Sequence, residues 1–281
     1  MSSSFSSQVL NGSYHGHAPE SFGGFFDTWL REKETDLEDL KAAIAYSEST
    51  RSCNESMRNR VRRIMGHYEN YYRVKSESTK KYVLKMFSPP WMSNPEGSFL
   101  WIGGWRTSTT LYLLFSVAGI QFEARFGELL RGLRTATTGD QGDLSHSQLT
   151  QVNELQVQTI CEEKDLTERL AAQQEIVADT SMVELSHIAT ELMRDSNSKS
   201  SGQVGTRSMN ERVESTLDTK QRKFKEIQEK ADDLRLRTLR NVVDILTPIQ
   251  AVHFLIAAVV LHLRVHEWGM KKDAIAHSPQ N

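Results

Sequence analysis

The sequence predicts an all-α protein, built as a bundle of long amphipathic helices in a single domain with a disordered N-terminus. Apolar residues recur at steps of three and four along most of the 281 residues, as they do on one face of a helix. Only 6 prolines and 16 glycines interrupt the chain, which is few for an all-β sandwich or a glycine-rich α/β enzyme. No segment of useful length alternates with the period of a strand.

Composition narrows the class of protein further. Hydrophobic residues make up 38% of the chain and charged residues 25%, which is typical of a globular protein. The 2 cysteines are too few for a disulfide framework or a zinc cluster. A net charge of -2 argues against a generally basic nucleic-acid coat. The N-terminus lacks the basic and apolar regions of a signal peptide, so we expect the protein in the nucleus, the cytoplasm or both.

Local composition predicts the domain organisation. Residues 1–20 are rich in Ser, Gly and His without periodicity, and they are interpreted as a disordered lead-in. Residues 21–270 form the helical domain, with polar internal linkers near 135–143 and 197–208. Residues 271–281 are expected to be a disordered tail.

The first two helices are predicted from clear apolar stripes. The first begins at Phe22 and carries aromatic and aliphatic residues at helical spacing as far as Ile44. The second runs from about Asn54 to Met86 and ends before Pro89, because a proline disfavours helical geometry in the residue before it. An irregular aromatic segment follows, which holds three of the five tryptophans within fifteen residues.

The remaining helices follow from the same spacing, with a predicted break or kink at Gly119. Residues 197–208 separate the last two helices from the long acidic helix before them. The seam of the penultimate helix is heptad-like, with Lys220 in one seam position, and it permits self-association into a homo-oligomer. The predicted helices are Leu111–Val117, Phe122–Leu133, one long helix through 149–176 that continues over 182–192, Val213–Leu234, and a last helix from Pro248.

The most apolar window, Ile249–Val265, raises the question of a membrane span. Two histidines and Arg264 interrupt it, and it is shorter than the roughly 20 apolar residues that a span needs. We therefore expect a buried core helix and no membrane partner.

The sequence offers little catalytic chemistry. It contains no phosphate-binding glycine loop, no dinucleotide fingerprint and no nucleophile elbow, so we do not expect an enzyme. His262 and His266 lie four residues apart, so both imidazoles could face one centre from a helix. Imidazoles suit zinc, copper, nickel or haem iron, but surface hydrogen bonding explains the spacing equally well.

Residues 51–86 carry ten Lys or Arg against three Glu. Such a basic amphipathic helix could engage calmodulin, an acidic protein face or nucleic acid. The alternative is internal pairing with residues 144–194, which carry nine acidic against three basic side chains. The candidate contact residues on the basic helix are Arg58, Arg62, Arg63, Arg73, Lys80 and Lys81.

Three segments occur in an order that resembles a known family. FFDTWL lies near the start, PPWMSNPEGSFLWIGGWRTST in the middle, and LTPIQAVHFLIAAVVLHLRVHEWG at the end. Together they resemble the Delay of Germination domain of plants, over roughly residues 20–270. The same domain forms the C-terminal part of the TGA basic-leucine-zipper transcription factors.

The resemblance implies a non-enzymatic regulator of seed dormancy and germination that acts by protein binding. Its expected partners are clade A type 2C protein phosphatases of the abscisic acid response, with TGA-type factors as a further possibility. It also implies haem binding by His262 and His266, which match the family's histidine pair. Phe25, Phe26 and Trp29 are the expected aromatic anchors of the protein contact, although the same residues could equally be core.

The alternative function is a transcription regulator with sequence-specific DNA binding, directly or through a TGA-type zipper partner. Only about twenty residues precede Phe22, so we expect no basic DNA-contacting helix in the usual place. This departure from the TGA pattern disfavours direct DNA binding.

Overall fold

A computed structural model describes residues 22–49, 54–130, 144–176, 179–195 and 203–276 of the chain. Eight helices and one two-stranded hairpin make up these residues, which confirms the all-α prediction. The first half contains α1 (Phe22–Ser49), α2 (Asn54–Phe87), α3 (Asn94–Gly97), β1 (Leu100–Trp101), β2 (Gly104–Trp105) and α4 (Ser108–Leu130). The second half contains α5 (His146–Glu175), α6 (Thr180–Asp195), α7 (Gln203–Ile245) and α8 (Pro248–Ala276).

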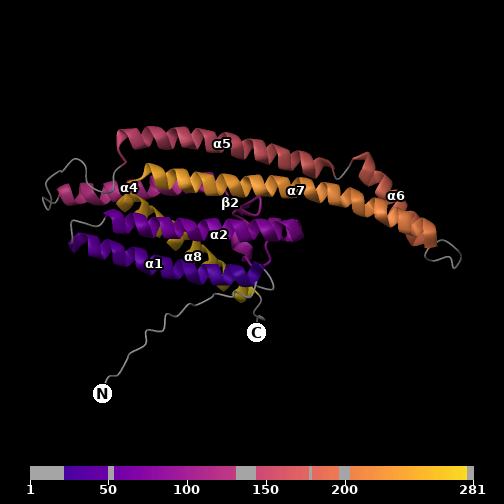
Figure 1. The fold of residues 1–281 in the computed structure, drawn as a ribbon, viewed down its shortest axis with the longest axis horizontal. Coiled ribbons are helices and arrows are strands. Elements are labelled where there is room, and N and C mark those ends of the chain that lie inside the picture. The colour runs from indigo at the N-terminus through magenta and orange to yellow at the C-terminus, as the bar shows by residue number, and fades with distance from the viewer. Residues whose placement is uncertain (1–21, 50–53, 131–143, 177–178, 196–202, 277–281) are drawn as a thin grey trace, which may run out of the picture.

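The helices lie side by side in a long bundle. Figure 1 shows α7 between α5 and α2, with α1 on the far side of α2 and α8 behind α1 and α2. The N-terminal part of α7 reaches beyond the main bundle, where α6 packs beside it. Six helices contribute to the largest cluster of buried apolar side chains, which includes Leu40, Ile64, Leu111, Val152, Val242 and Phe254.

The boundaries of the early helices agree with the sequence prediction, but four later predictions were wrong. Helix α4 passes through Gly119, since an exposed glycine inside a helix costs only about 1 kcal/mol and does not have to end it. The predicted linker 197–208 and tail 271–281 are helical over 203–208 and 271–276. The lead-in 1–20 and the linker 135–143 lie outside the described residues.

The long helix predicted to run from 149 to 192 is two helices. Asp179 lies between α5 and α6, where its carboxylate accepts a hydrogen bond from the Met182 backbone N–H at 2.9 Å. It also receives the Lys220 ammonium of α7 at 2.9 Å. The lysine that interrupts the predicted seam therefore fastens α7 to the turn before α6.

The C-terminal part of that seam packs inside the chain. Ile227, Ala231 and Leu234 are buried inside the chain, in a cluster with Ile102 of the hairpin and Leu166 of α5. Intramolecular packing thus accounts for the apolar stripe over this part of α7.

Of the helices described, α8 alone is long and apolar enough to cross a membrane, by length and composition. Its buried face includes Val252, Phe254 and Leu255, which belong to the main core. This packing explains the apolar composition that the sequence shows after Pro248.

The short hairpin after α3 is tightly held. Its turn residues Ile102 and Gly103 have φ values of 46° and 64°, as a two-residue hairpin turn requires. A side chain at Gly103 would collide with the Met86 carbonyl, and one at Gly104 would meet the Arg235 guanidinium. Glycines therefore let the hairpin lie directly against the end of α2 and the middle of α7.

A buried charge cluster fixes this docking. Lys75 of α2 donates hydrogen bonds of 2.8 Å to both the Gly103 carbonyl and the Asp232 carboxylate of α7. Arg235 also pairs with Asp232 and donates to hairpin carbonyls, including that of Ile102 at 3.0 Å. One carboxylate therefore compensates two buried cations that hold the hairpin.

Removing this carboxylate should destabilise the fold strongly. Asp232→Asn leaves Lys75 and Arg235 without a counter-charge, and breaking a buried pair in this way costs about 3–5 kcal/mol. The matched control is Asp233→Asn, because the Asp233 side chain is 72% exposed and lies 3.5 Å from Arg237. Urea denaturation followed by circular dichroism measures both; equal losses in the two variants would contradict the role given to Asp232.

Candidate functional site

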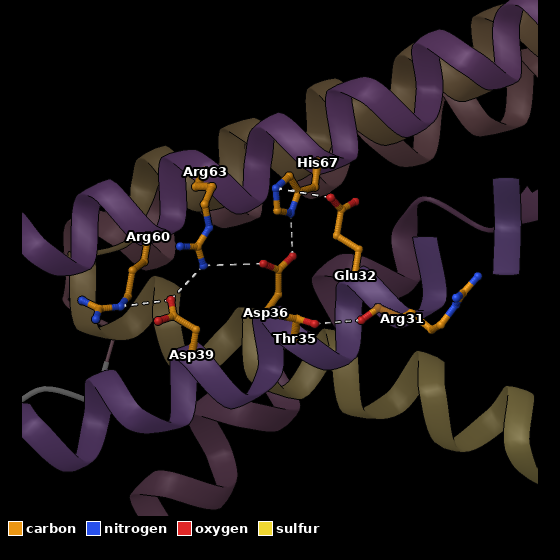
Figure 2. Close-up of polar contacts among 8 residues, drawn as sticks. All are labelled: Arg31, Glu32, Thr35, Asp36, Asp39, Arg60, Arg63 and His67. Carbon is orange, nitrogen blue, oxygen red and sulfur yellow. Dashed lines mark hydrogen bonds and ion pairs between the residues drawn. The ribbon is translucent and has the colours of Figure 1, made fainter. Parts of the chain in front are cut away.

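The basic face of α2 pairs with α1. Arg60 and Arg63 contact the Asp39 carboxylate at 3.0 and 2.8 Å, and His67 Nδ1 lies 2.8 Å from Asp36 Oδ2. Figure 2 shows these side chains facing one another across the two helices. Burial opposes ionisation of Asp39, but the hydrogen bonds from Arg63 and Arg60 outweigh it and lower the pKa of that carboxyl.

Internal pairing of the basic helix is therefore real, but the predicted partner was wrong. Residues 144–194 fold as α5 and α6, which lie against α7 and, for α5, also against α4. Of the six basic candidates, Arg63 belongs to the α1–α2 network, while Lys81 is exposed. The other four contact polar residues of α2 itself: Arg58 with Glu55, Arg62 with Asn59, Arg73 with Asn70, and Lys80 with Glu77.

The predicted aromatic anchors are core residues. Phe26 is 0% exposed and Trp29 4% exposed, while Phe25 is half-buried against the same cluster. Trp29 stacks on Tyr71 of α2 with ring centroids 4.1 Å apart. The expectation that these rings form an exposed contact surface was wrong, because they join α1 to α2 instead.

The two histidines of α8 have different environments. His262 packs edge-on against Trp29 at 5.2 Å and parallel to Trp105 at 5.9 Å. Its Nε2 is buried without a hydrogen-bond partner among the described residues. Burial, followed by the charges of Lys33 and His266, holds the pKa of His262 well below its usual range, so the ring is neutral at pH 7.

His266 instead belongs to an ion pair with α3. Its Nδ1 lies 2.9 Å from Glu96 Oε2, and Glu96 is 1% exposed. The hydrogen bond to Glu96 raises the pKa of His266 although partial burial opposes the shift. Ser93 also donates to Glu96 from its backbone N–H and its hydroxyl, so the carboxylate ties α3 to α8.

A cavity of about 140 Å³ lies beside His262, and we refer to it as the His262 cavity. Five helices and the hairpin converge on it: α1, α2, α4, α7 and α8, with β2 and the residues that follow it. Its lining combines aromatic rings with polar groups, including Trp29, Lys33, Tyr68, Trp105, Thr107 and His262.

Lys33 is the most unusual member of this lining. Its ammonium donates to the Tyr68 hydroxyl at 2.8 Å and lies over the Trp29 and Tyr68 rings at 4.2 and 4.4 Å. Burial lowers the pKa of Lys33 from 10.5 to about 7, although the charge of Asp36 acts in the opposite direction. A shift of this size corresponds to a cost on the order of 5 kcal/mol for keeping the charged form buried.

The fit of a haem to the histidine pair can be judged from this geometry. A neutral imidazole with an unpartnered Nε2 is a suitable iron ligand, and His262 has both properties. However, pockets that enclose drug-sized ligands measure about 300–1,000 Å³, and the His262 cavity has about 140 Å³. His266 is also engaged by Glu96, so the pair does not fit a haem in this conformation.

The described ranges contain no candidate metal cluster. No group of three or more His, Cys, Asp or Glu side chains there could hold a metal ion. Lys33 was not among the predicted site residues, although one signal was present in the sequence. Lys33 follows Trp29 by four residues on the buried face of α1, where a charged residue interrupts an apolar stripe.

Comparisons with known proteins show one matching family and several similar plant proteins. A family model described as DOG1, seed dormancy control, matches residues 36–116. Protein DOG1-like 3 of Arabidopsis thaliana is 30% identical over 254 residues, which cover 89% of this chain and 84% of that protein. Transcription factor TGA2 of the same plant is 27% identical over 242 residues, covering 86% of this chain and 61% of the factor. Protein RESPONSE TO ABA AND SALT 1 is 25% identical over 255 residues, covering 88% and 94%.

Replacing Lys33 should stabilise the chain in a pH-dependent manner. The folded state releases this proton near pH 7 and the unfolded state near 10.5, so between these values the unfolded state binds more protons. The penalty is therefore complete below pH 7 and disappears as the pH approaches 10.5. We expect Lys33→Met to gain about 2–4 kcal/mol at pH 6, after the loss of cation–π contacts, and less at pH 9.

Urea denaturation of both proteins at pH 6 and pH 9 measures this difference. Lys41→Met is the matched control, because Lys41 lies on the same helix with its side chain 51% exposed and pairs with Glu38. Its effect should stay within about 0.5 kcal/mol at either pH. A Lys33→Met variant less stable than the parent chain at pH 6 would refute the burial penalty.

Proposed function

Because the chain belongs to the DOG1 family of plant proteins, described as seed dormancy control, we propose that it is a non-enzymatic regulator of seed dormancy and germination. It acts by binding other proteins, in the nucleus, the cytoplasm or both. The partner we propose is a clade A type 2C protein phosphatase of the abscisic acid response. The similarity to a protein named for its response to ABA and salt supports this link to the hormone.

The proposed contact with the partner protein involves one surface of the molecule. We call it the distal α2 surface, and it comprises Lys80, Lys81, Tyr82, Leu84 and Lys85. Tyr82 and Leu84 are 56% and 59% exposed and lie two residues apart in the sequence. The backbone at Tyr82 is not helical, with φ -139° and ψ 46°.

The chemistry of this surface defines the partner's side of the contact. Exposed tyrosine and leucine side chains supply apolar anchors, and aromatic residues are enriched among the residues that dominate binding energy. Three lysines surround them, and Lys85 lies 5.5 Å from the centre of the Tyr82 ring. The complementary face is an apolar depression with an acidic rim. Calmodulin has the same chemistry and is the first competitor to test against the phosphatase.

Truncation of the two apolar side chains should weaken phosphatase binding. We expect Tyr82→Ala/Leu84→Ala to lose at least about tenfold in affinity, because interface anchors contribute more than about 1 kcal/mol each. Tyr112→Ala is the matched control, since Tyr112 is 59% exposed on α4, away from this surface. Pull-down and surface plasmon resonance against a purified phosphatase measure the change.

Two outcomes would count against the distal α2 surface. Undiminished binding by the folded double variant would remove it from the contact. Equal losses in the double variant and in Tyr112→Ala would indicate a nonspecific apolar effect. Trp29→Ala is unsuitable as an interface probe, because truncating a buried tryptophan costs about 3–5 kcal/mol of stability.

A second candidate function is a transcription regulator that reaches DNA with a TGA-type partner. The similarity to Transcription factor TGA2 and Transcription factor TGA6 supports it. Direct DNA binding would draw on the exposed arginines of α2, Arg58, Arg62 and Arg73. These charges are dispersed, and phosphate neutralisation supplies most nonspecific affinity for DNA, so we expect contact through the partner.

A gel-shift assay separates the two functions. The purified chain alone should leave duplex DNA unshifted at low salt, and it should retard a preformed complex of a TGA factor with DNA only if the second candidate holds. A salt-dependent shift by the chain alone would establish direct DNA binding and replace the proposal of a phosphatase regulator as the primary function.

A further inference from the structure

The His262 cavity contains polar atoms that the protein itself leaves without partners. Trp105 Nε1, Thr107 Oγ1 and His262 Nε2 are buried, and none has a hydrogen bond within the described structure. Leaving a buried polar atom unpaired costs stability, so most such atoms find a partner in the protein or in ordered water. Three of them around one cavity are groups with which a bound molecule or water can pair.

The charged side chains around the cavity indicate which class of ligand it binds. The other cations of the lining already have counter-charges: Lys75 and Arg235 share Asp232, and Arg106 pairs with Glu163 at 2.9 Å. No described Asp or Glu lines the cavity. The charge of Asp36 acts on Lys33 from outside it, but the Asp36 carboxylate is paired with His67 Nδ1 at 2.8 Å. The closest partners of Lys33 are a tyrosine hydroxyl and two aromatic faces. A ligand with one negative charge would supply the missing counter-ion.

The size and walls of the cavity restrict the rest of the ligand. Its volume of about 140 Å³ is close to that of an apolar cavity of about 150 Å³ that accepts one benzene molecule. Indole, phenol and imidazole rings form much of its wall, and they pack well against a flat aromatic ligand. Arg106 and Leu261 belong to the lining and are exposed, so they mark the rim through which a ligand enters.

We propose that the His262 cavity binds a small aromatic monocarboxylic acid. The ammonium of Lys33 pairs with the carboxylate, and Trp105 Nε1 and Thr107 Oγ1 are further donors for its oxygens. The ring occupies the aromatic part of the cavity, where His262 Nε2 can pair with a hydroxyl substituent. This binding site is separate from the distal α2 surface, so the proposal stands whether or not the chain binds a phosphatase.

Calorimetric titration of the full-length protein with sodium benzoate tests the proposal. Benzamide, which has the same ring without the charge, is the matched ligand. We expect a Kd of about 1 mM or tighter for benzoate and at least about tenfold weaker binding of benzamide. Lys33→Met should reduce benzoate affinity at least tenfold, whereas Lys41→Met should leave it unchanged. Thr107→Val should reduce it about threefold.

A cavity-filling variant locates the binding site independently of charge. Ala258 lines the cavity from α8, and Ala258→Phe should abolish benzoate binding while the circular dichroism spectrum remains that of the parent chain. Ala258→Leu replaces Ala258→Phe in this role if the larger ring prevents folding.

Three results would overturn the proposal. They are the absence of benzoate binding at 10 mM by the parent protein, equal affinities for benzoate and benzamide, and full binding by the folded Lys33→Met protein. The first result would mean that only water fills the cavity. Retained binding by folded Ala258→Phe would be a fourth such result, because it would place the ligand elsewhere.

Discussion

The compensation of Lys75 and Arg235 by the Asp232 carboxylate is the interaction on which the rest of the structure depends. It joins α2 to α7 in the interior and, through the hairpin carbonyls, holds the two short strands against both helices. Without it, two buried cations would face each other inside the bundle. The hairpin in turn places Trp105 beside His262 of α8, so the position of the cavity wall follows from this one carboxylate.

Helices α1 and α2 contact each other in two ways, through ion pairs at one end and through aromatic side chains at the other. Near Asp39 the two helices meet through ion pairs that are partly open to solvent, and such pairs contribute little net stability. Towards the start of α1 they meet through Phe26, Trp29 and Tyr71, which are buried. The aromatic end therefore supplies most of the stability, and the charged end fixes which faces of the helices meet.

The sequence predicted the helices well because their apolar stripes are long, and the prolines at 89 and 90 mark one boundary clearly. It failed where a single residue decides the local structure, as at Asp179, whose role in separating α5 from α6 requires knowing where Lys220 lies. Phe26 and Trp29 could not be assigned to core or surface from spacing alone, since a buried core and a protein contact both use aromatic side chains at helical spacing. The charge cluster of Lys75, Asp232 and Arg235 was inaccessible, because its members lie up to 160 positions apart and only packing brings them together.

The fold keeps a costly cation at Lys33 because that charge serves the ligand proposed for the His262 cavity. Stability alone would favour an apolar side chain there, as function and stability commonly oppose each other at binding sites. The most direct measurement is an NMR titration of the Lys33 side chain in the free protein and with bound benzoate. We expect a midpoint near pH 7 in the free protein and a higher midpoint in the complex. A midpoint near the ordinary value of 10.5 in the free protein, unchanged by benzoate, would contradict it.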